Sequence, residues 1–447
     1  MTEEKKRISR ERVIEHFQKM IRLRTVSHQD GSLTDQAVFR RFRDLLRELY
    51  PAVFAAAQAW EIGAYGFLIQ IPGKSSAAPS VLMAHMDVVD ADEKTWSVPP
   101  FDAVLQDGRI YGRGTLDTKC TLCAIMEAAE YNLNRGFVPE QDIYLSFGGE
   151  EEVSGKTCAE IVSFLAEQGI RPGFVLDEGG AVIPEGMPGY RGQAAMIGIA
   201  EKGVANYRLS IADGSGGHAS VPPRHTVAGR LAKAAVRLEQ YRFPARLSTA
   251  VRTMFEELSH VVPGYEKPLF RHPRLAWPAI ASAAAVLGST FNAMVRTTTA
   301  VTLMQGGTSY NVLPERCEIG VNARLVEGDT VQSVAETLRK VGKDPALQVD
   351  VISGSDPTPV SDINCEAWRK LCKVIRSVWK DIPAAPYQMN GGTDGRFFAK
   401  ITPYVYRFTP MVMSREDRAK VHGTDESIEV SALMKMVTFY VRLTEEL

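Results

Sequence analysis

Residues 142–152 read DIYLSFGGEEE, a stretch in which an apolar segment runs into three consecutive carboxylates. Asp142–Phe147 has the β-branched, aromatic and aliphatic side chains of a short buried strand, and two glycines end it. Carboxylates at the end of an apolar strand are costly unless they meet protons, cations or a metal ion. In isolation, Glu150, Glu151 and Glu152 would be interpreted as a solvated turn, so the rest of the chain decides their meaning.

The segments around this stretch alternate between strand and helix patterns. Apolar runs predict strands at 81–89 and 174–176, and helical spacing predicts helices at 118–132 and 157–168. A strand that is apolar on both faces suits a parallel sheet covered by helices on both sides. We therefore expect an α/β domain with a mainly parallel sheet.

The pattern changes after about residue 192. Strands are expected at 203–211, 301–304 and 347–352, and helices at 227–241 and 331–341, which is an α+β pattern. The proline-containing segment 242–290 has no assignable packing, and the first pattern resumes from about residue 362. The expected organisation is one domain built from 1–201 and 356–447, interrupted by an inserted α+β domain at 202–355.

Composition excludes several classes of protein. Lys and Arg (52) balance Asp and Glu (53) among 447 residues, so the basic excess of a nucleic-acid-binding protein is absent. No stretch approaches the roughly 20 apolar residues of a membrane span, and the polar start MTEEKKRISRER is unlike a signal peptide. Six cysteines in a chain of this length do not form a disulfide framework. We expect a cytoplasmic protein without nucleic-acid or membrane partners.

Imidazoles and carboxylates recur where the predicted strands end. His85 and Asp87 are two residues apart and share one face of a strand, where a carboxylate can orient a metal-bound imidazole. Asp117 stands between a glycine turn and a helix, where it could also serve as a helix cap. Asp177 ends another strand, and His422 lies in the turn VHGTDE.

Sites in open parallel sheets form beyond the carboxyl ends of the strands, so these side chains are expected to converge. Five nitrogen and oxygen ligands without a thiolate suit zinc, with manganese or cobalt as alternatives. Cys120 and Cys123 are interpreted as buried structural cysteines because no second pair completes a zinc site. The chain has neither a G-x-S-x-G elbow nor a G-x-G-x-x-G loop, so a serine hydrolase and a dinucleotide enzyme lack support.

Eight motifs occur in a fixed order along the chain: HMD at 85–87, GRGTLDTK at 112–119, GGEEEV at 148–153, LDEGG at 176–180, GGHASVPP at 216–223, NVLPE at 311–315, GGTDGRFF at 391–398 and HGTDE at 422–426. Together they resemble the dinuclear-zinc aminoacylase/carboxypeptidase family, which includes carboxypeptidase G and succinyl-diaminopimelate desuccinylase. LDEGG, with NAMVRTTTAVT at 292–302, is most similar to the carboxypeptidase S and N-acyl-amino-acid hydrolase branch.

The resemblance implies a role for each converging residue. Asp117 would bridge two divalent metal ions, which are zinc in this family, and a cis peptide would follow it. One metal ion would be completed by His85 and Asp177, and the other by Glu151 and His422. The remaining catalytic roles implied are Glu150 as the general base and Asp87 as the carboxylate behind His85.

For the inserted domain, the resemblance implies a lid that also carries dimer contacts. His218 would donate to the tetrahedral oxyanion, supplied by a partner subunit or by domain closure. Asn292 and Arg324 would hold the substrate carboxylate, and Gly392 and Thr393 would line the same pocket. An alternative for Arg324 is a surface ion pair with Glu327.

These expectations converge on a metal-dependent hydrolase that cleaves an amide bond next to a free carboxylate. The candidate substrates are dipeptides, C-terminal residues of short peptides and N-acyl amino acids. The alternatives are an esterase or deacetylase that uses the same metals, or a catalytically silent member that binds metal or a peptide. A homodimer through the inserted domain is a further expectation.

Overall fold

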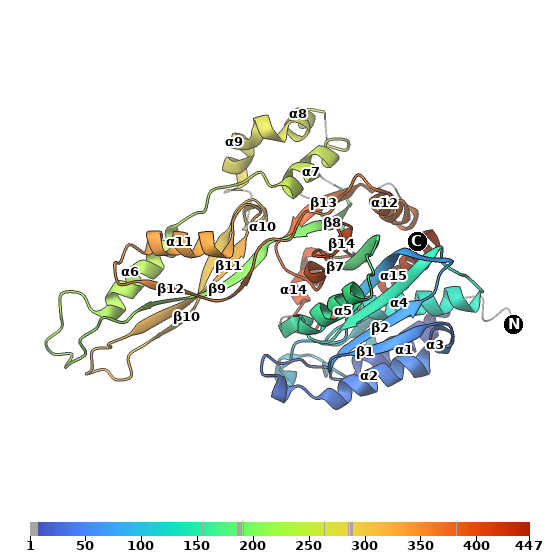
Figure 1. Cartoon of the computed structure of the whole chain (residues 1–447), viewed down its shortest axis with the longest axis horizontal. Coiled ribbons are helices and arrows are strands. Elements are labelled where there is room, and N and C mark those ends of the chain that lie inside the picture. The colour runs from blue at the N-terminus through green and yellow to red at the C-terminus, as the bar shows by residue number, and fades with distance from the viewer. Residues whose placement is uncertain are drawn as a thin grey trace. The chain divides into compact units, whose positions relative to one another are not determined.

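The structure is a computed structural model that describes residues 8–153, 155–185, 190, 192–262, 264–284, 286, 289–380 and 382–447. The chain divides into two compact units, each considered by itself (Figure 1). Unit 1 comprises 1–199, 360–386 and 393–447, and unit 2 comprises 200–359 and 387–392. The short stretch 387–392, expected in the catalytic domain, groups with unit 2.

Unit 1 is built on an eight-stranded sheet with the strand order β1-β2-β6-β3-β7-β14-β8-β13. The four central strands are parallel: β6 (Gln141–Gly148), β3 (Ser75–His85), β7 (Phe174–Ile183) and β14 (Val405–Val412). The outer strands run antiparallel where their pairing is described, and they are β1 (Gln58–Ile62), β2 (Gly66–Ile71), β8 (Ala194–Glu201) and β13 (Ala384–Met389). The prediction of a mainly parallel α/β sheet is confirmed at the centre of the sheet.

Helices cover both faces of this sheet (Figure 1). One face packs against α4 (Lys119–Asn134) and α15 (Val430–Glu446), with α1 (Arg10–Ile21) and α12 (Glu366–Val378) beside them. The other face packs against α5 (Lys156–Glu167) and α13 (Gly395–Phe398). Because β3 and β6 are apolar on both sides, both layers bury hydrophobic surface and fix the positions of the strand ends.

The smaller elements of unit 1 lie around this core. Two helices follow α1: α2 (Gln36–Leu49) and α3 (Pro51–Ala56). A three-stranded sheet joins β4 (Val104–Gln106), β5 (Arg109–Tyr111) and β15 (Ser427–Glu429), and α14 (Arg415–Lys420) precedes β15. No described helix of the chain is long and apolar enough to cross a membrane.

Unit 2 contains a four-stranded antiparallel sheet in the order β10-β11-β9-β12. Its strands are β10 (Thr298–Gly306), β11 (Cys317–Leu325), β9 (Gly203–Ile211) and β12 (Gln348–Ser355). The helices α6 (Val227–Gln240) and α11 (Val331–Gly342) pack on one face and share one hydrophobic core with β9 and β11. The segment of unassigned packing forms α7 (Thr249–Leu258), α8 (Lys267–Arg271), α9 (Pro273–Ala284) and α10 (Ser289–Met294).

Candidate metal centre

The candidate site lies where the central parallel strands of unit 1 end. His85 is the last residue of β3 and Gly148 is the last of β6. The three glutamates follow after Gly149, in the next turn. Strand β7 carries Asp177 and Glu178 beside them. Since β3 is parallel to both β6 and β7, their carboxyl ends meet at the same edge of the sheet.

His85 faces two carboxylates through one ring nitrogen. Its Nε2 lies 3.0 Å from Asp117 Oδ1 and 3.2 Å from Glu178 Oε1. Its Nδ1 lies 2.9 Å from the backbone oxygen of Asp87 and 3.4 Å from the Asp87 carboxylate. An Nδ1–H that donates to Asp87 leaves Nε2 free to act as a ligand, which is how second-shell partners usually orient a metal-binding histidine.

Asp117 reaches a second imidazole through its other carboxylate oxygen. Asp117 Oδ2 lies 3.1 Å from His422 Nε2, and the same nitrogen lies 3.0 Å from Glu152 Oε2. Asp117 therefore lies between His85 and His422, and each imidazole has one further carboxylate beside it. The expected cis peptide after Asp117 is present at Asp117–Thr118.

Two of the carboxylates in this cluster differ from those expected. The sequence prediction placed Asp177 beside His85, but Glu178 occupies that position. The Asp177 carboxylate accepts hydrogen bonds from the backbone N–H of Gly395 at 2.6 Å and of Glu178 at 2.9 Å. Because β7 continues past both residues to Ile183, neighbouring side chains point to opposite faces of the strand, and only Glu178 faces His85.

The same one-residue difference occurs in the glutamate turn. The prediction paired Glu151 with His422, but Glu152 makes that contact. Glu151 instead lies with His85 and Glu178, their ligand atoms all within 4.8 Å of one another. The predicted general base Glu150 is directed elsewhere, since its carboxylate accepts a 2.6 Å hydrogen bond from the Thr157 hydroxyl at the start of α5.

The backbone of this turn is held by Asp87. Its carboxylate accepts hydrogen bonds from the N–H groups of Glu151 at 3.2 Å and Glu152 at 3.1 Å, and from the Ser27 hydroxyl at 2.7 Å. These bonds fix which of the three glutamate side chains turns toward the histidines. Asp87 thus positions both His85 and the glutamate turn.

The carboxylates that gather in this cluster shift the pKa values of the two histidines and of Glu178. Burial of His85 acts to lower its pKa, but Glu178, Asp117 and Asp87 outweigh it and hold the pKa well above its usual value. Hydrogen bonds to Asp117 and Glu152 raise the pKa of His422 to about 10. Burial, with the nearby charge of Asp117, raises the pKa of Glu178 to about 8. The cluster therefore has an excess of negative charge that cations stabilise.

The donor set fits divalent metal ions. Three carboxylates and two imidazoles converge without a thiolate, which suits zinc and other cations that accept nitrogen and oxygen ligands. In addition, Glu152 Oε1 is buried and has no hydrogen-bond partner among the described residues. A buried carboxylate oxygen without a donor is costly, and a bound cation would satisfy it.

Glu426, a residue that the sequence analysis did not single out, ties the loops of Asp117 and His422 together. Its buried carboxylate accepts hydrogen bonds from the N–H groups of Leu116 at 2.6 Å and Asp117 at 3.2 Å. It also accepts one from Arg113 Nη1 at 2.7 Å, while Arg113 Nη2 donates to the His422 carbonyl at 3.2 Å. The only sequence signal for this role was the glutamate that ends HGTDE.

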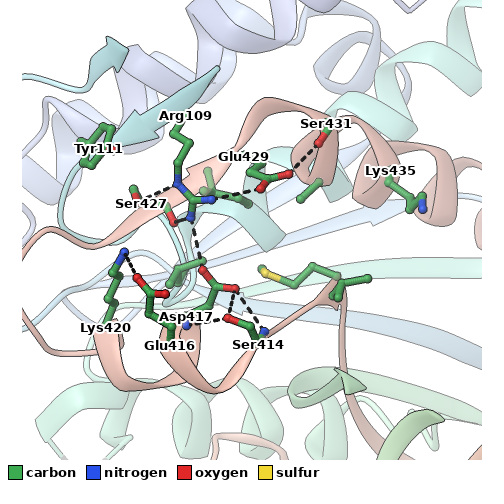
Figure 2. A pocket seen from close by; sticks show the side chains of 15 residues that line it. Arg109, Tyr111, Ser414, Glu416, Asp417, Lys420, Ser427, Glu429, Ser431 and Lys435 are labelled. Atoms are coloured by element: carbon green, nitrogen blue, oxygen red, sulfur yellow. Dashed lines mark hydrogen bonds and ion pairs between the residues drawn. The ribbon is translucent and has the colours of Figure 1, made fainter. Parts of the chain in front are cut away.

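A cavity of about 590 Å³ lies beside the loops that Glu426 joins, and it is lined in part by Leu116 and Ser427. Figure 2 shows Arg109 at its centre, reaching toward β15 on one side and α14 on the other. The Arg109 guanidinium donates to Ser427, Glu429 and Asp417 at 2.9–3.3 Å. Because its charged side chains largely pair with one another, we assign no ligand to this cavity.

The predicted oxyanion donor His218 lies in unit 2 on an exposed loop. Its Nδ1 accepts a hydrogen bond from the Ser220 backbone N–H at 3.1 Å and lies 2.7 Å from the Ser220 hydroxyl. A backbone N–H can only donate, so Nδ1 is the acceptor and neutral His218 carries its proton on Nε2. That nitrogen is available as a donor.

The predicted substrate-binding residues divide between the units. Asn292 on α10 and Arg324 on β11 are both partly buried in unit 2, whereas Gly392 ends unit 2 and Thr393 begins the next part of unit 1. The backbone of Arg324 pairs with its neighbours in the sheet, but its guanidinium has no hydrogen bond or ion pair with any residue that the structure describes. The alternative pairing with Glu327 is wrong, because that carboxylate accepts from the N–H and hydroxyl of Thr249 at 2.7 and 2.9 Å.

Comparison with known proteins identifies the family. Peptidase family M20/M25/M40 matches residues 81–446. The Xenopus tropicalis N-fatty-acyl-amino acid synthase/hydrolase PM20D1 is 36% identical over 444 residues, covering 98% of this chain and 86% of that protein. The Dictyostelium discoideum probable carboxypeptidase S-like 2 is 32% identical, covering 94% and 82%.

Solved structures agree on the fold. The M20 family metallo-carboxypeptidase Sso-CP2 from Sulfolobus solfataricus has a TM-score of 0.72 at 16% identity, covering 97% of this chain and 98% of that one. The family match, the relatives and the histidine–carboxylate cluster at the strand ends agree with the resemblance found in the sequence. The chain belongs to peptidase family M20/M25/M40 and is a metal-dependent hydrolase of amide bonds.

Proposed function

We propose that this enzyme hydrolyses the amide bond of N-acyl amino acids, including long-chain ones, at a centre of two divalent metal ions. The observation that carries the proposal is the position of Asp117 between two imidazoles, each with one further carboxylate beside it. The choice of substrate is supported by the relative named an N-fatty-acyl-amino acid synthase/hydrolase, which matches nearly the whole chain. Short peptides are the second candidate class, supported by the carboxypeptidase S-like relative.

The proposed ligands follow the observed contacts rather than the sequence assignment. His85 and Glu178 would hold one metal ion, Glu152 and His422 the other, and Asp117 would bridge them. Zinc is the proposed metal, with manganese and cobalt as alternatives that accept the same ligands. When bound, such ions polarise the scissile carbonyl and lower the pKa of water toward neutrality.

The proposed general base is Glu151 in place of Glu150. Glu151 lies with the ligand atoms of His85 and Glu178, yet the contact with His422 belongs to its neighbour Glu152. A carboxylate beside the ligands can take a proton from the attacking water and deliver it to the leaving amine. Glu150 is an unsuitable base because its carboxylate is engaged by the Thr157 hydroxyl.

Side chains of unit 2 are proposed to complete the site around the substrate. Arg324 is a partly buried cation without a protein partner among the described residues, so a substrate carboxylate is a suitable counter-ion. Asn292, Gly392 and Thr393 are proposed neighbours of that carboxylate. His218 would donate Nε2–H to the tetrahedral oxyanion, through closure of the units or from a partner subunit.

We further propose that the protein is cytoplasmic and forms a homodimer. The six cysteines are all free, which suits the reducing cytoplasm. A homodimer through unit 2 is supported by its apolar sheet residues, since Leu303 and Ile352 are exposed. Solution sizing of wild-type enzyme over a hundredfold range of concentration would test the dimer, and a monomer throughout would contradict it.

The decisive experiment for the function is a substrate panel with metal control. Enzyme stripped by a chelator and reconstituted with zinc, manganese or cobalt is assayed on N-acyl amino acids of 2 to 18 acyl carbons, on dipeptides, and on matched amides without the carboxylate. We expect metal-dependent hydrolysis of the N-acyl amino acids and little turnover of the amides without a carboxylate. Preference for dipeptides would overturn the substrate assignment, and hydrolysis that survives chelation would overturn the mechanism.

A matched ester for each amide separates the esterase alternative from the amidase. If the proposal is correct, the enzyme hydrolyses the amides as well as the matched esters. Cleavage of the esters alone would identify an esterase. Metal binding with no turnover of any member of the panel would favour the catalytically silent alternative.

A further inference from the structure

The helical segment of unit 2 has an unusual distribution of charge. Residues 267–314 contain no aspartate or glutamate, in a chain that has 53 acidic residues among 447. The same stretch carries Lys267, Arg271 and Arg274 close together at α8 and α9. All three are exposed, and none forms an ion pair with a described residue. Glu266, directly before this stretch, is the single acidic residue of 265–286 and forms no ion pair with a described residue, so the segment keeps an excess of positive charge.

Large apolar side chains are exposed beside these cations. Tyr265 is 83% exposed, Leu275 is 84% exposed and Val286, just beyond α9, is 85% exposed. Side chains of this size are rarely left so accessible as a group on a soluble surface unless the surface binds something. Figure 1 shows α7, α8 and α9 gathered beside one another, away from the four-stranded sheet of the same unit.

Helix α9 is apolar on its outer side as well as its inner side. Ile280 and Ala284 are buried, four residues apart, and face the neighbouring helices. Leu275, Ala279 and Ser282 are exposed at helical spacing on the other side. A helix with a leucine and small side chains toward solvent, and with basic residues at its beginning, is similar to an interfacial helix, which lies on a lipid surface without crossing it.

We propose that residues 265–284 with Val286, here called the α8–α9 platform, dock on an anionic lipid surface, which revises the expectation of no membrane partner. The exposed tyrosine, leucine and valine would enter the boundary between headgroups and acyl chains. Lys267, Arg271 and Arg274 would meet the negative headgroups. The inference rests on the proposed function, because long-chain N-acyl amino acids are amphiphiles that partition into such surfaces, and docking would bring the enzyme to its substrate.

A second copy of the chain is a less suitable occupant of the platform. A symmetric dimer places the same patch of both subunits against itself. Lys267, Arg271 and Arg274 of one copy would then face the same residues of the other, with Glu266 as the single carboxylate of the platform to offset three cations. An anionic lipid surface satisfies both the apolar and the basic side chains of the platform.

Vesicle co-sedimentation with full-length, metal-loaded enzyme tests the proposal. The probes are vesicles of phosphatidylcholine alone and of phosphatidylcholine with 30% phosphatidylglycerol. We expect binding to the anionic vesicles to be at least tenfold tighter and to weaken as salt is raised. The variants Tyr265→Ser with Leu275→Ser, and Arg271→Gln with Arg274→Gln, are each expected to lose at least tenfold in vesicle binding.

Matched controls come from unit 1. Leu33→Ser removes a side chain that is 66% exposed, and Arg40→Gln removes an exposed cation without an ion pair among the described residues. Both controls should bind vesicles as wild type does. Equal binding by platform variants and wild type, or equal losses in the controls, would overturn the proposal. Loss of a dimer in the platform variants, with no vesicle binding by wild type, would assign the platform to self-association instead.

Activity measurements separate this inference from the proposed function. Platform variants should hydrolyse a soluble N-acetyl amino acid as wild type does, with an unchanged thermal unfolding midpoint. Their KM should rise several-fold for a long-chain N-acyl amino acid presented in anionic vesicles. If wild type hydrolyses both substrates but does not bind vesicles, only the docking proposal fails. If it hydrolyses neither, the proposed function fails.

Discussion

Arg113 and Glu426 form a buried ion pair with 2.7 Å between Nη1 and Oε2, and this pair joins the two loops that carry Asp117 and His422. Glu426 holds the backbone before and at Asp117, whereas Arg113 holds the carbonyl of His422. The proposed bridging ligand Asp117 and the proposed ligand His422 are thus positioned by one salt bridge. Their separation is fixed before any metal binds.

Replacing Glu426 should therefore weaken the metal centre although Glu426 is no ligand. We expect Glu426→Gln to lower metal affinity by about 10–100-fold, the usual effect of losing an outer-shell partner. Chelator competition measures the affinity, and the absorption spectrum of cobalt-substituted enzyme reports the ligand geometry. Glu429→Gln on the neighbouring strand is the control, because that carboxylate is exposed and pairs with Arg109. A normal cobalt spectrum and affinity in Glu426→Gln would contradict this positioning role.

The three consecutive glutamates should separate into three phenotypes. Glu151→Gln should retain both metal ions and lose about 10²–10⁴ in kcat, the range expected for a general base. Glu152→Gln should lose metal affinity, because it removes the carboxylate beside His422. Glu150→Gln should keep substantial activity, since its carboxylate contacts the Thr157 hydroxyl. Metal content and kcat are measured for all three, and loss of turnover in Glu150→Gln with full activity in Glu151→Gln would reverse the assignment.

Adjacent residues on β7 provide a second comparison of this kind. Glu178→Gln should reduce metal affinity without lowering the stability of the metal-free protein, because it removes a carboxylate whose ionisation the folded chain disfavours. Asp177→Asn should leave metal affinity largely unchanged and lower the stability of the metal-free protein, because the Asp177 carboxylate accepts a hydrogen bond from the Gly395 N–H at 2.6 Å. A hydrogen bond to a charged group contributes about 1.5–3 kcal/mol, so a loss in that range is expected in urea unfolding. Equal loss of metal in both variants would mean that both carboxylates are ligands.

The strongly periodic elements of the fold were predictable from the sequence. The strand expected at 203–211 is β9 (Gly203–Ile211), and the helix expected at 227–241 is α6 (Val227–Gln240). Strand β11 (Cys317–Leu325) was missed although its side chains alternate between buried and partly buried. The segment 242–290 gave no prediction because its prolines interrupt the helical spacing, and its packing depends on contacts between α7, α8 and α9.

The site was predictable as a set of motifs but not residue by residue. The sequence places three equivalent carboxylates after a strand, and their directions depend on a short turn held by Asp87. Likewise, the choice between Asp177 and Glu178 depends on β7 continuing to Ile183, whereas the predicted strand ended at residue 176. An error of one residue in a strand or turn redirects a side chain to the opposite side, which is why both assignments moved by one position.

The stability of the metal-free protein should fall as pH rises, and metal binding should oppose this fall. His422 has a pKa of about 10 in the folded metal-free chain against 6.5 ordinarily, so its stabilising protonation is complete below about pH 6.5 and is lost as pH rises toward 10. Glu178, raised from 4.5 to about 8, likewise holds a proton that the unfolded chain has released, and its contribution is lost between those values. Both groups act to lower the unfolding midpoint of chelator-treated enzyme from pH 6 to pH 9, whereas burial lowers the pKa values of Lys119 and Lys202 to about 7 and these two groups act in the opposite direction.

Metal binding should oppose this trend, because metal ions compete with protons for imidazole and carboxylate ligands. The rise in midpoint on adding zinc should therefore grow as the pH increases over the same range. His422→Gln should flatten the pH dependence of the metal-free protein and reduce the effect of zinc, whereas the exposed-site variant Glu429→Gln should behave as wild type does. A metal-free midpoint with the same pH dependence in His422→Gln as in wild type, or an effect of zinc that shrinks with pH, would show that the histidine–carboxylate cluster does not control this linkage.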